Sequence, residues 1–513
     1  MMRLQQVLAT ARSLVVEVDD GSAWAGSVAR DWSLDGQRVV HSTRNVLTLH
    51  GLEPDRDYAL RVLAADGEVA TLNLRTRTCA GRLDVRECGA RGDGDHDDSA
   101  ALQAAIASCP PGGTVYFPEG DWLSTALFLR SHIHLQFAAG ARLLGHPERA
   151  RWPLLPGRLR DPAADAQRIV GSWEGQPRAM HGGLLTGIGV EDVQIHGAGV
   201  LDGNAAAAGW WVRAKAPHRG WRPRLLYLSA CQDISVAGLR CLDAGSWQLH
   251  ALRSERLLFA GLDIHAPVDS PNTDGLNPES CRDVQIAGVR ISTGDDCIAV
   301  KSGKRVAGLD PRPSQGVVIR QCLLKHGHGA VVIGSETAGG VYDVRATMCR
   351  FEDTERGLRI KTRRGRGRMA VVDGVQLTQI QMARVGTPFV VNSFYWCDPD
   401  GKAPEVGDRQ PRPVDAGTPE VRNLVLQDID CQDTAHCAIF LLGLPEQPIA
   451  GVRVERFRVR YAAHPTPGYP DMAAGIALTA RAGVQAWNVR DLTLAELDLD
   501  GATMPQLQLE NVT

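Results

Sequence analysis

A short segment recurs along most of this chain, and the repetition constrains the fold more than any other feature. Each copy holds a brief apolar–polar alternation, a turn residue and a second brief alternation, as in VEDVQIHGAGVLDG at 190–203 and CRDVQIAGVRISTG at 281–294. Internal repeats of this size indicate a solenoid, in which each repeat packs on its neighbours. Further copies lie at 231–244, 254–267, 314–327, 341–354, 372–385, 421–434, 449–462 and 489–502.

The repeats alternate with a period of two and contain β-branched residues, which favours strands over helices. Leucine-rich repeats would need regular Leu and Asn positions, and these are missing. The sequence therefore predicts an all-β fold, a right-handed parallel β-helix whose rungs stack about 4.8 Å apart. An Ala-rich segment at 97–113 predicts a helix, capped by Asp98 or Ser99, that covers the first rung.

Residues 1–80 have a different pattern. NVLTLHGLEPDRDYALRVLAADGEVATLNLRTRT, at 45–78, alternates apolar and polar positions with turn residues between the runs, which indicates antiparallel strands. The LHGLEPDRDYALRV segment resembles a corner of fibronectin type III sandwiches, with Tyr58 as the corner tyrosine. We predict two domains, a fibronectin type III-like β-sandwich at 1–80 and a parallel β-helix catalytic domain at 81–513.

Composition excludes some classes of partner. The net charge is −3, whereas a nucleic-acid-binding protein usually has a basic bias, and no apolar run is long enough for a membrane span. The twelve cysteines lack a CxxC pattern and lie mostly at the edges of apolar runs, which favours buried packing over disulfides or metal ligation. This cysteine usage points weakly to a reducing compartment. We expect neither nucleic acid nor membrane as a partner, and composition does not indicate an oligomeric state.

Polar residues interrupt four successive repeats at similar positions. Residues a whole rung apart lie above one another in a solenoid, so we expect these side chains on one wall. Arg359 and Lys361 are two positions apart on a strand and face the same side. The predicted site comprises Asn272, Asp274, Asp295, Asp296, His328, Arg359 and Lys361.

This set of residue types suits glycoside hydrolysis. The reaction needs one protonated carboxyl group at the leaving oxygen and one ionised carboxylate that activates water. Carboxylates that are crowded together separate their pKa values, because they cannot all ionise cheaply. Arginine and lysine suit a negatively charged sugar. The sequence thus predicts hydrolysis of a glycosidic bond next to a negatively charged sugar, and it implies no metal or organic cofactor.

The motifs NTDG, GDDC, GHG and RIK occur at 272–275, 294–297, 327–329 and 359–361. In this order and spacing they resemble the four motifs of the polygalacturonases, glycoside hydrolase family 28, over roughly residues 83–505. The resemblance implies inverting hydrolysis of α-1,4-galacturonosidic bonds in polygalacturonate, pectin or oligogalacturonides. The implied roles are general acid for Asp295, water activation for Asp274 and Asp296, tuning of the acid for His328, and substrate binding for Asn272, Arg359 and Lys361.

Two features resemble the bacterial exo-acting branch of this family. Ala330-Val331-Val332 follows the histidine where endo-acting members usually have a polar residue, and a fibronectin-like domain precedes the repeats. The insertion at 386–420 would wall off one end of a cleft. The resemblance also implies secretion or a periplasmic location, although the sequence has no clear signal peptide.

Two alternatives stay open. One is a rhamnogalacturonan or xylogalacturonan hydrolase on the same scaffold. The other is a β-helix that binds pectate without hydrolysing it, or cleaves it as a calcium-dependent lyase.

Overall fold

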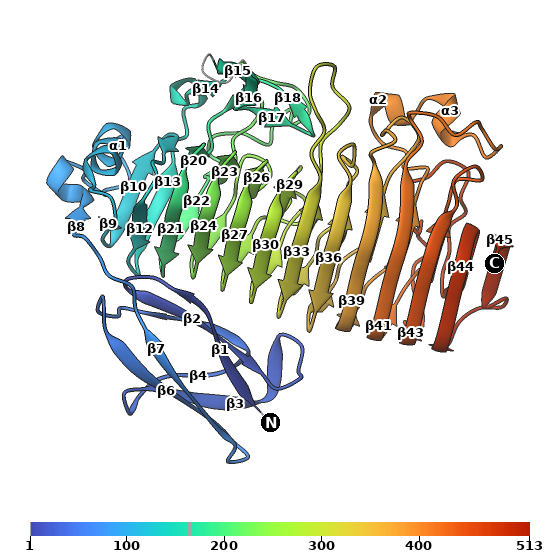
Figure 1. Ribbon diagram of the computed structural model, residues 1–513, viewed down its shortest axis with the longest axis horizontal. Helices are drawn as coiled ribbons and strands as arrows, with labels where there is room; N and C mark the ends of the chain where they lie inside the picture. Colours follow the sequence, from blue (N-terminus) through green and yellow to red (C-terminus); the bar gives the residue numbers. More distant parts are fainter. Residues whose placement is uncertain (1, 162–165) are drawn as a thin grey trace.

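The computed structural model describes residues 2–161 and 166–513. It is nearly all-β, and the parallel β-helix forms a long stack of strands that runs from the first rung to the C-terminus (Figure 1). A single sheet of 32 strands contains the stack. Along most of it, strands three apart in the chain pair in parallel, and from β37 onward strands two apart do so. The predicted fold class is therefore confirmed.

Most rungs have three strands, whereas the sequence repeats suggested two. The repeats match the second and third strand of each rung. The first strand was missed because its side chains are buried on both faces, so it shows no alternation. One rung comprises β29 (Leu276–Glu279), β30 (Arg282–Ala287) and β31 (Arg290–Ser292), and the next comprises β32 (Ile298–Val300), β33 (Ser314–Arg320) and β34 (Leu323–Lys325).

The core is built from columns of like residues. Val284, Val317 and Val344 pair in register on consecutive rungs, and each is fully buried. Such stacking removes apolar side chains from water on every rung. Nine of the twelve cysteines are buried and all twelve are unpaired, which agrees with a packing role. Among the described residues, no helix has the length and apolarity needed to cross a membrane.

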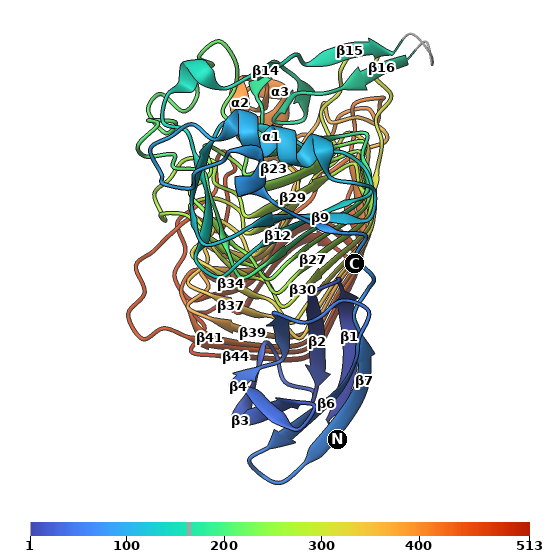
Figure 2. The same cartoon turned by 90° about the vertical axis from the view of Figure 1, so that its left-hand side faces the viewer.

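Helix α1 (Ser99–Ser108) covers the first rung, as the sequence predicted (Figure 2). It buries Leu102, Ala105 and Ile106 against the open end of the stack. The helix ends earlier than the predicted segment at 97–113. Asp98 occupies the N-cap position, but its carboxylate accepts the backbone N–H groups of Arg91 and Gly92 instead of a helix N–H.

The N-terminal residues fold into two antiparallel sheets packed around Trp32. The Tyr58 hydroxyl accepts the N–H of Glu53 at 2.8 Å, which is the bond expected of a corner tyrosine. The predicted boundary at residue 80 falls between β7 and β8 (Arg82–Asp84), and we propose it as the division between the two domains. The sheets are β1 (Arg3–Ala9), β2 (Ser13–Asp19) and β5 (Val46–His50), and β4 (Gln37–Arg44), β3 (Ala25–Leu34), β6 (Asp57–Ala64) and β7 (Val69–Arg75).

The sandwich docks on a row of glycines at one corner of the β-helix. Gly238, Gly261 and Gly288 follow β24 (Gln232–Ala237), β27 (Glu255–Ala260) and β30, and all have positive φ. A Cβ atom on any of them would lie 2.3–2.5 Å from an atom of β5, so the strand approaches because these side chains are absent. The β5 residues that fill this space are His50, Thr48 and Val46, in the same order.

Polar contacts extend this interface to the next two rungs. Gln321 follows β33, and its side chain accepts from Asn45 and donates to the carbonyl of Ser22, both at 3.0 Å. Trp24 donates its N–H to the carbonyl of Met348, which follows β36 (Val341–Thr347). The sandwich therefore spans the corners of five successive rungs.

Candidate active site

Three carboxylates meet where two first strands of consecutive rungs begin. Asp274 and Asp296 each lie two residues before a strand, and Leu276 of β29 pairs with Ile298 of β32. This register stacks Asp274 and Asp296 on consecutive rungs. Asp295 directly precedes Asp296 in the chain. One carboxylate oxygen from each of the three lies within 4.8 Å of the others. Asp274 and Asp296 are buried, whereas the side chain of Asp295 is 22% exposed.

The predicted cations surround this cluster from the next two rungs. Lys361 Nζ donates to Asp296 Oδ2 at 2.6 Å, and an Arg359 guanidinium nitrogen lies 3.7 Å from Asp296 Oδ1. Both residues belong to β38 (Arg356–Lys361). His328 precedes β35 (Val331–Ile333), and its Nδ1 lies 3.3 Å from Asp295 Oδ1. The structure thus brings together six of the seven predicted residues.

Asn272 has a different surrounding. Its side-chain oxygen accepts from Arg222 at 2.6 Å, and it makes no hydrogen bond to the three carboxylates within the described residues. Arg222 lies over the ring of Trp173, which stacks on Trp221 at 4.3 Å. Asn272 is therefore joined to an aromatic wall on the N-terminal side of the cluster.

Lys301 belongs to the site but was not predicted. Its Nζ lies 3.7 Å from Asp274 Oδ2 and 3.1 Å from Glu336 Oε2. The strand register places Lys301 in the same column as Lys361, two rungs earlier. The signal was present in the sequence, since AVK at 299–301 aligns with RIK at 359–361 once the rungs are in register.

Asp471 is a second residue that was not predicted. Arg359 Nε donates to its Oδ1 at 2.9 Å, and Asn392 Nδ2 donates to its Oδ2 at 2.9 Å. Arg356 holds the same segment by donating to the carbonyl of Pro470. Asp471 is fully buried in the connection 462–481, between β43 (Ile449–Tyr461) and β44 (Ala482–Asp500). No repeat or motif marks it, because its position depends on where this connection folds back.

A wall covers the cations on the C-terminal side. The predicted insertion at 386–420 begins later than expected, because Thr387–Asn392 forms strand β40. The chain then leaves the stack and forms α2 (Asp398–Gly401) and α3 (Pro404–Gly407), which project above the strands (Figure 1). The ring of Tyr395 lies 5.5 Å from the Arg359 guanidinium and 5.4 Å from Lys361 Nζ.

Burial and neighbouring charges move the pKa values of Asp274 and Asp295 in opposite directions. Burial, with the charges of Asp295 and Asp296, raises the pKa of Asp274 to about 8. Burial alone would also raise the pKa of Asp295, but the hydrogen bond and charge of His328 lower it to about 2. The same bond raises the pKa of His328 to about 8. At neutral pH, Asp274 therefore carries a proton while Asp295 is ionised beside a cationic histidine.

Within residues 2–161 and 166–513, these three aspartates form the one cluster with metal-ligand spacing. Carboxylate oxygens suit Ca²⁺. Their neighbours, however, are protein cations: Lys361 is paired with Asp296, Lys301 is close to Asp274, and His328 contacts Asp295. A metal ion bound here would lie beside two ammonium groups, so the cluster fits a proton-transfer site better than a calcium site.

Comparisons with known proteins show which family the chain belongs to. The family model described as glycosyl hydrolases family 28 matches residues 168–467, and one described as rhamnogalacturonase A/epimerase, pectate lyase-like, matches 83–144. The chain is 32% identical over 389 residues to a probable polygalacturonase of Vitis vinifera, covering 73% of each chain. It is 25% identical over 419 residues to an exo-poly-α-D-galacturonosidase of Dickeya chrysanthemi, covering 74% of this chain and 68% of that one.

Among solved structures, the family 28 exopolygalacturonase of Yersinia enterocolitica has the same fold, with a TM-score of 0.69 at 18% identity. The match covers 100% of this chain and 98% of that one. The family model alone spans more than half of the 513 residues, and the Vitis relative exceeds 30% identity over most of the chain. The chain therefore belongs to glycosyl hydrolases family 28 and is a glycoside hydrolase.

Proposed function

We propose that this glycosidase hydrolyses the α-1,4-galacturonosidic bonds of polygalacturonate or oligogalacturonides, and that it acts from a chain end. One observation carries the proposal: three carboxylates that can share a proton lie beside Lys361, Lys301 and Arg359. Carboxylates alone would serve a neutral sugar. Cations at the same place suit a sugar that carries its own carboxylate. The relatives described as polygalacturonases support the same substrate.

Asp295 is the proposed general acid, because it is the member of the cluster that reaches the surface. In the free protein the proton is on Asp274. A bound uronate brings its own negative charge close to Asp295 and excludes water, and both effects raise the pKa of Asp295. The proton then passes from Asp274 to Asp295, which donates it to the glycosidic oxygen as the C–O bond breaks. Asp274, now ionised, orients the attacking water together with Asp296 and accepts its proton.

Inversion is proposed from the family resemblance. The carboxylate oxygens lie closer together here than the roughly 6.5–9.5 Å that usually accompanies inversion. The spacing therefore does not itself favour inversion, and proton NMR of the first anomer released is the appropriate measurement. We expect the β-anomer from the α-linked substrate; initial release of the α-anomer would show retention.

The exo-action is supported by the covering of the cations. Arg359 and Lys361 are only 2% and 5% exposed, since Tyr395 and Asp471 lie against them. A polymer bound at the three aspartates thus meets the wall on the C-terminal side. A chain end fits this arrangement better than the middle of a long chain.

The test is product analysis by mass spectrometry after brief incubation with polygalacturonate, with ultraviolet absorbance followed in parallel. We expect saturated mono- or digalacturonate while the polymer stays long, and no such products from Asp295→Asn. A ladder of saturated oligomers would show endo-action. An absorbing, unsaturated product would show a lyase. Turnover of rhamnogalacturonan or xylogalacturonan in place of polygalacturonate would identify a different pectic substrate.

A further inference from the structure

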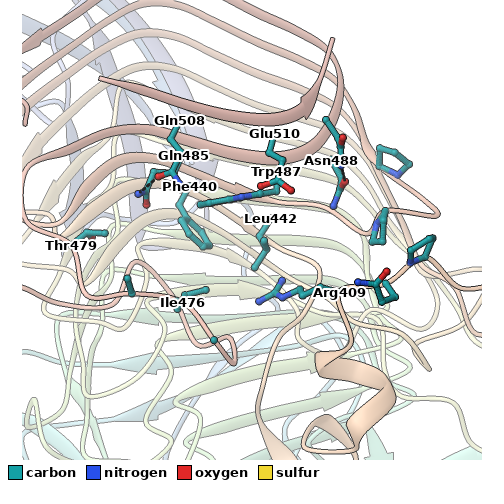
Figure 3. Close-up of a pocket in the computed structure, with 17 residues that line it drawn as sticks. Arg409, Phe440, Leu442, Ile476, Thr479, Gln485, Trp487, Asn488, Gln508 and Glu510 are labelled. Atoms are coloured by element: carbon teal, nitrogen blue, oxygen red, sulfur yellow. Dashed lines mark hydrogen bonds between the residues drawn. The ribbon is translucent and has the colours of Figure 1, made fainter. Parts of the chain in front are cut away.

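A second cavity lies on the same face of the β-helix, beyond the wall that covers Arg359. Its volume is about 760 Å³ (Figure 3). The floor is formed by the last strands of the stack, β42 (Cys437–Leu442), β44 and β45 (Leu507–Val512). The side facing the catalytic cluster is formed by Arg409 from the α2–α3 segment and by Ile476 from the connection that carries Asp471. The wall thus separates two sites on one sheet.

The strand register shows how the floor relates to the catalytic cluster. Arg359 pairs with Val390, and the next rungs carry Phe440 and Gln485 in the same column. The column of Lys361 continues in the same way to Leu442 and Trp487. At about 4.8 Å per rung, the floor begins about 10 Å beyond the catalytic cations. It is therefore a continuation of the face that holds the active site.

The floor combines an aromatic surface with amides. Trp487 lies 5.7 Å from the ring of Phe440 and is only partly buried, so one part of the indole remains open to the cavity. Gln485 donates to Gln508 at 3.0 Å, and the two amides lie one above the other beside the rings (Figure 3). A pyranose ring has an apolar face and a rim of hydroxyl groups, and this combination suits both.

Arg409 supplies a positive charge at the opposite side of the cavity from Gln508 (Figure 3). Its guanidinium lies 4.0 Å from the ring centre of Phe394 and donates to the carbonyl of Ala474 at 2.8 Å. No carboxylate pairs with it in the described parts of the chain. An arginine that is fixed in place without a counter-ion favours an anionic ligand, and a carboxylate matches its geometry.

We propose that this cavity is a second oligogalacturonide-binding site, the distal site, in which a sugar ring packs on Trp487 and a uronate carboxylate binds Arg409. The proposal rests on the proposed function for the class of ligand. The distal site holds no carboxylate cluster like that of Asp274, Asp295 and Asp296, so it binds without cleaving. Holding one part of a pectic chain raises the local concentration of chain ends at the active site.

The test is isothermal titration calorimetry with trigalacturonate on Asp295→Asn, which should strongly slow turnover and leave both sites in place. We expect two binding sites per chain, and one after adding Arg409→Gln. Trp487→Leu, checked for folding by thermal melting, should remove the same site through the aromatic surface. Arg412→Gln is the matched control, because this exposed arginine lies in the same segment but pairs with Asp408 and does not line the cavity.

Each result separates the distal site from the proposed function. Two sites that become one with Arg409→Gln support both proposals. One site that disappears with Arg409→Gln supports the distal site and counts against galacturonan binding at the catalytic cluster. One site that is unaffected by Arg409→Gln and Trp487→Leu overturns the distal site and leaves the proposed function standing.

Discussion

The corner of the β-helix that carries Gly238, Gly261 and Gly288 and the face that carries the three aspartates are built on neighbouring rungs. The two regions use the stacking of residues in opposite ways. At the corner, Gly238, Gly261 and Gly288 repeat one residue type, and the missing side chains admit strand β5. On the other face, Asp274 and Asp296 stack on consecutive rungs and lie beside lysines from later positions in the chain, so that opposite charges are neighbours.

At this corner a column of glycines makes a docking surface, whereas on the other face a column of unlike charges makes the candidate site. The two are independent, because the backbone register is fixed by the apolar core between them. Changes at one column should therefore leave the other intact, and the predictions below test that independence in order of expected effect.

Asp295→Asn should lower kcat on polygalacturonate by about 10²–10⁴-fold, because general acid catalysis usually contributes that much. The melting temperature should stay close to that of the parent chain, since Asp295 is partly exposed. Steady-state kinetics and thermal melting measure both. Retained turnover would remove Asp295 from the proposed mechanism.

Asp471→Asn should destabilise the protein by about 3–5 kcal/mol, because it removes the buried carboxylate that pairs with Arg359 and lies near Arg356. Loosening the wall should also lengthen the products toward a ladder of oligomers. Chemical denaturation and product analysis measure these effects. Asp408→Asn is the control: it breaks an exposed pair with Arg412 and should cost at most about 1 kcal/mol. Equal effects of the two changes would contradict the assigned role of Asp471.

Gly261→Ala should destabilise the docked sandwich by about 1–3 kcal/mol, because the added methyl group meets Thr48. The kcat per folded molecule should not change. Gly374→Ala is the matched control, since Gly374 also has positive φ but its nearest neighbour is 3.6 Å from the added Cβ atom. The difference in unfolding free energy between the two variants measures the cost of the contact with Thr48 apart from backbone strain. Equal unfolding free energies would show that the corner is not tightly packed.

The smallest expected effect is on pH dependence. The pKa of Asp274 is raised to about 8, so its proton is present below that pH and is lost above it. Because the mechanism needs that proton, kcat/KM should fall about tenfold per pH unit above about 8. The profile from neutral to alkaline pH measures this fall. A profile that stays flat through this range would show that the cluster does not supply the proton.

The sequence predicted the β-helix because the second and third strands of each rung alternate visibly. It placed six site residues together because polar residues interrupt four successive repeats at similar positions. It missed the first strand of each rung, since full burial removes the alternation. Lys301 was missed for the same reason, because its column becomes visible only when that strand is aligned with β38. Asp471 had no local signal at all. Its contact with Arg359 depends on a connection that folds back from more than one hundred residues away.

The docked sandwich also has a consequence for how the molecule opens. Rungs of a solenoid contact only their neighbours, so a bare stack unfolds piecemeal from its ends. Here the sandwich contacts the corners from β24 to β36, between Gly238 and Met348, so separating the rungs in that stretch also breaks contacts with the sandwich. The rungs that carry Asp274, Asp295 and Asp296 are among those that the sandwich contacts. Backbone amide hydrogen exchange should therefore be slow and cooperative in these rungs, and faster in the rungs between β36 and β45.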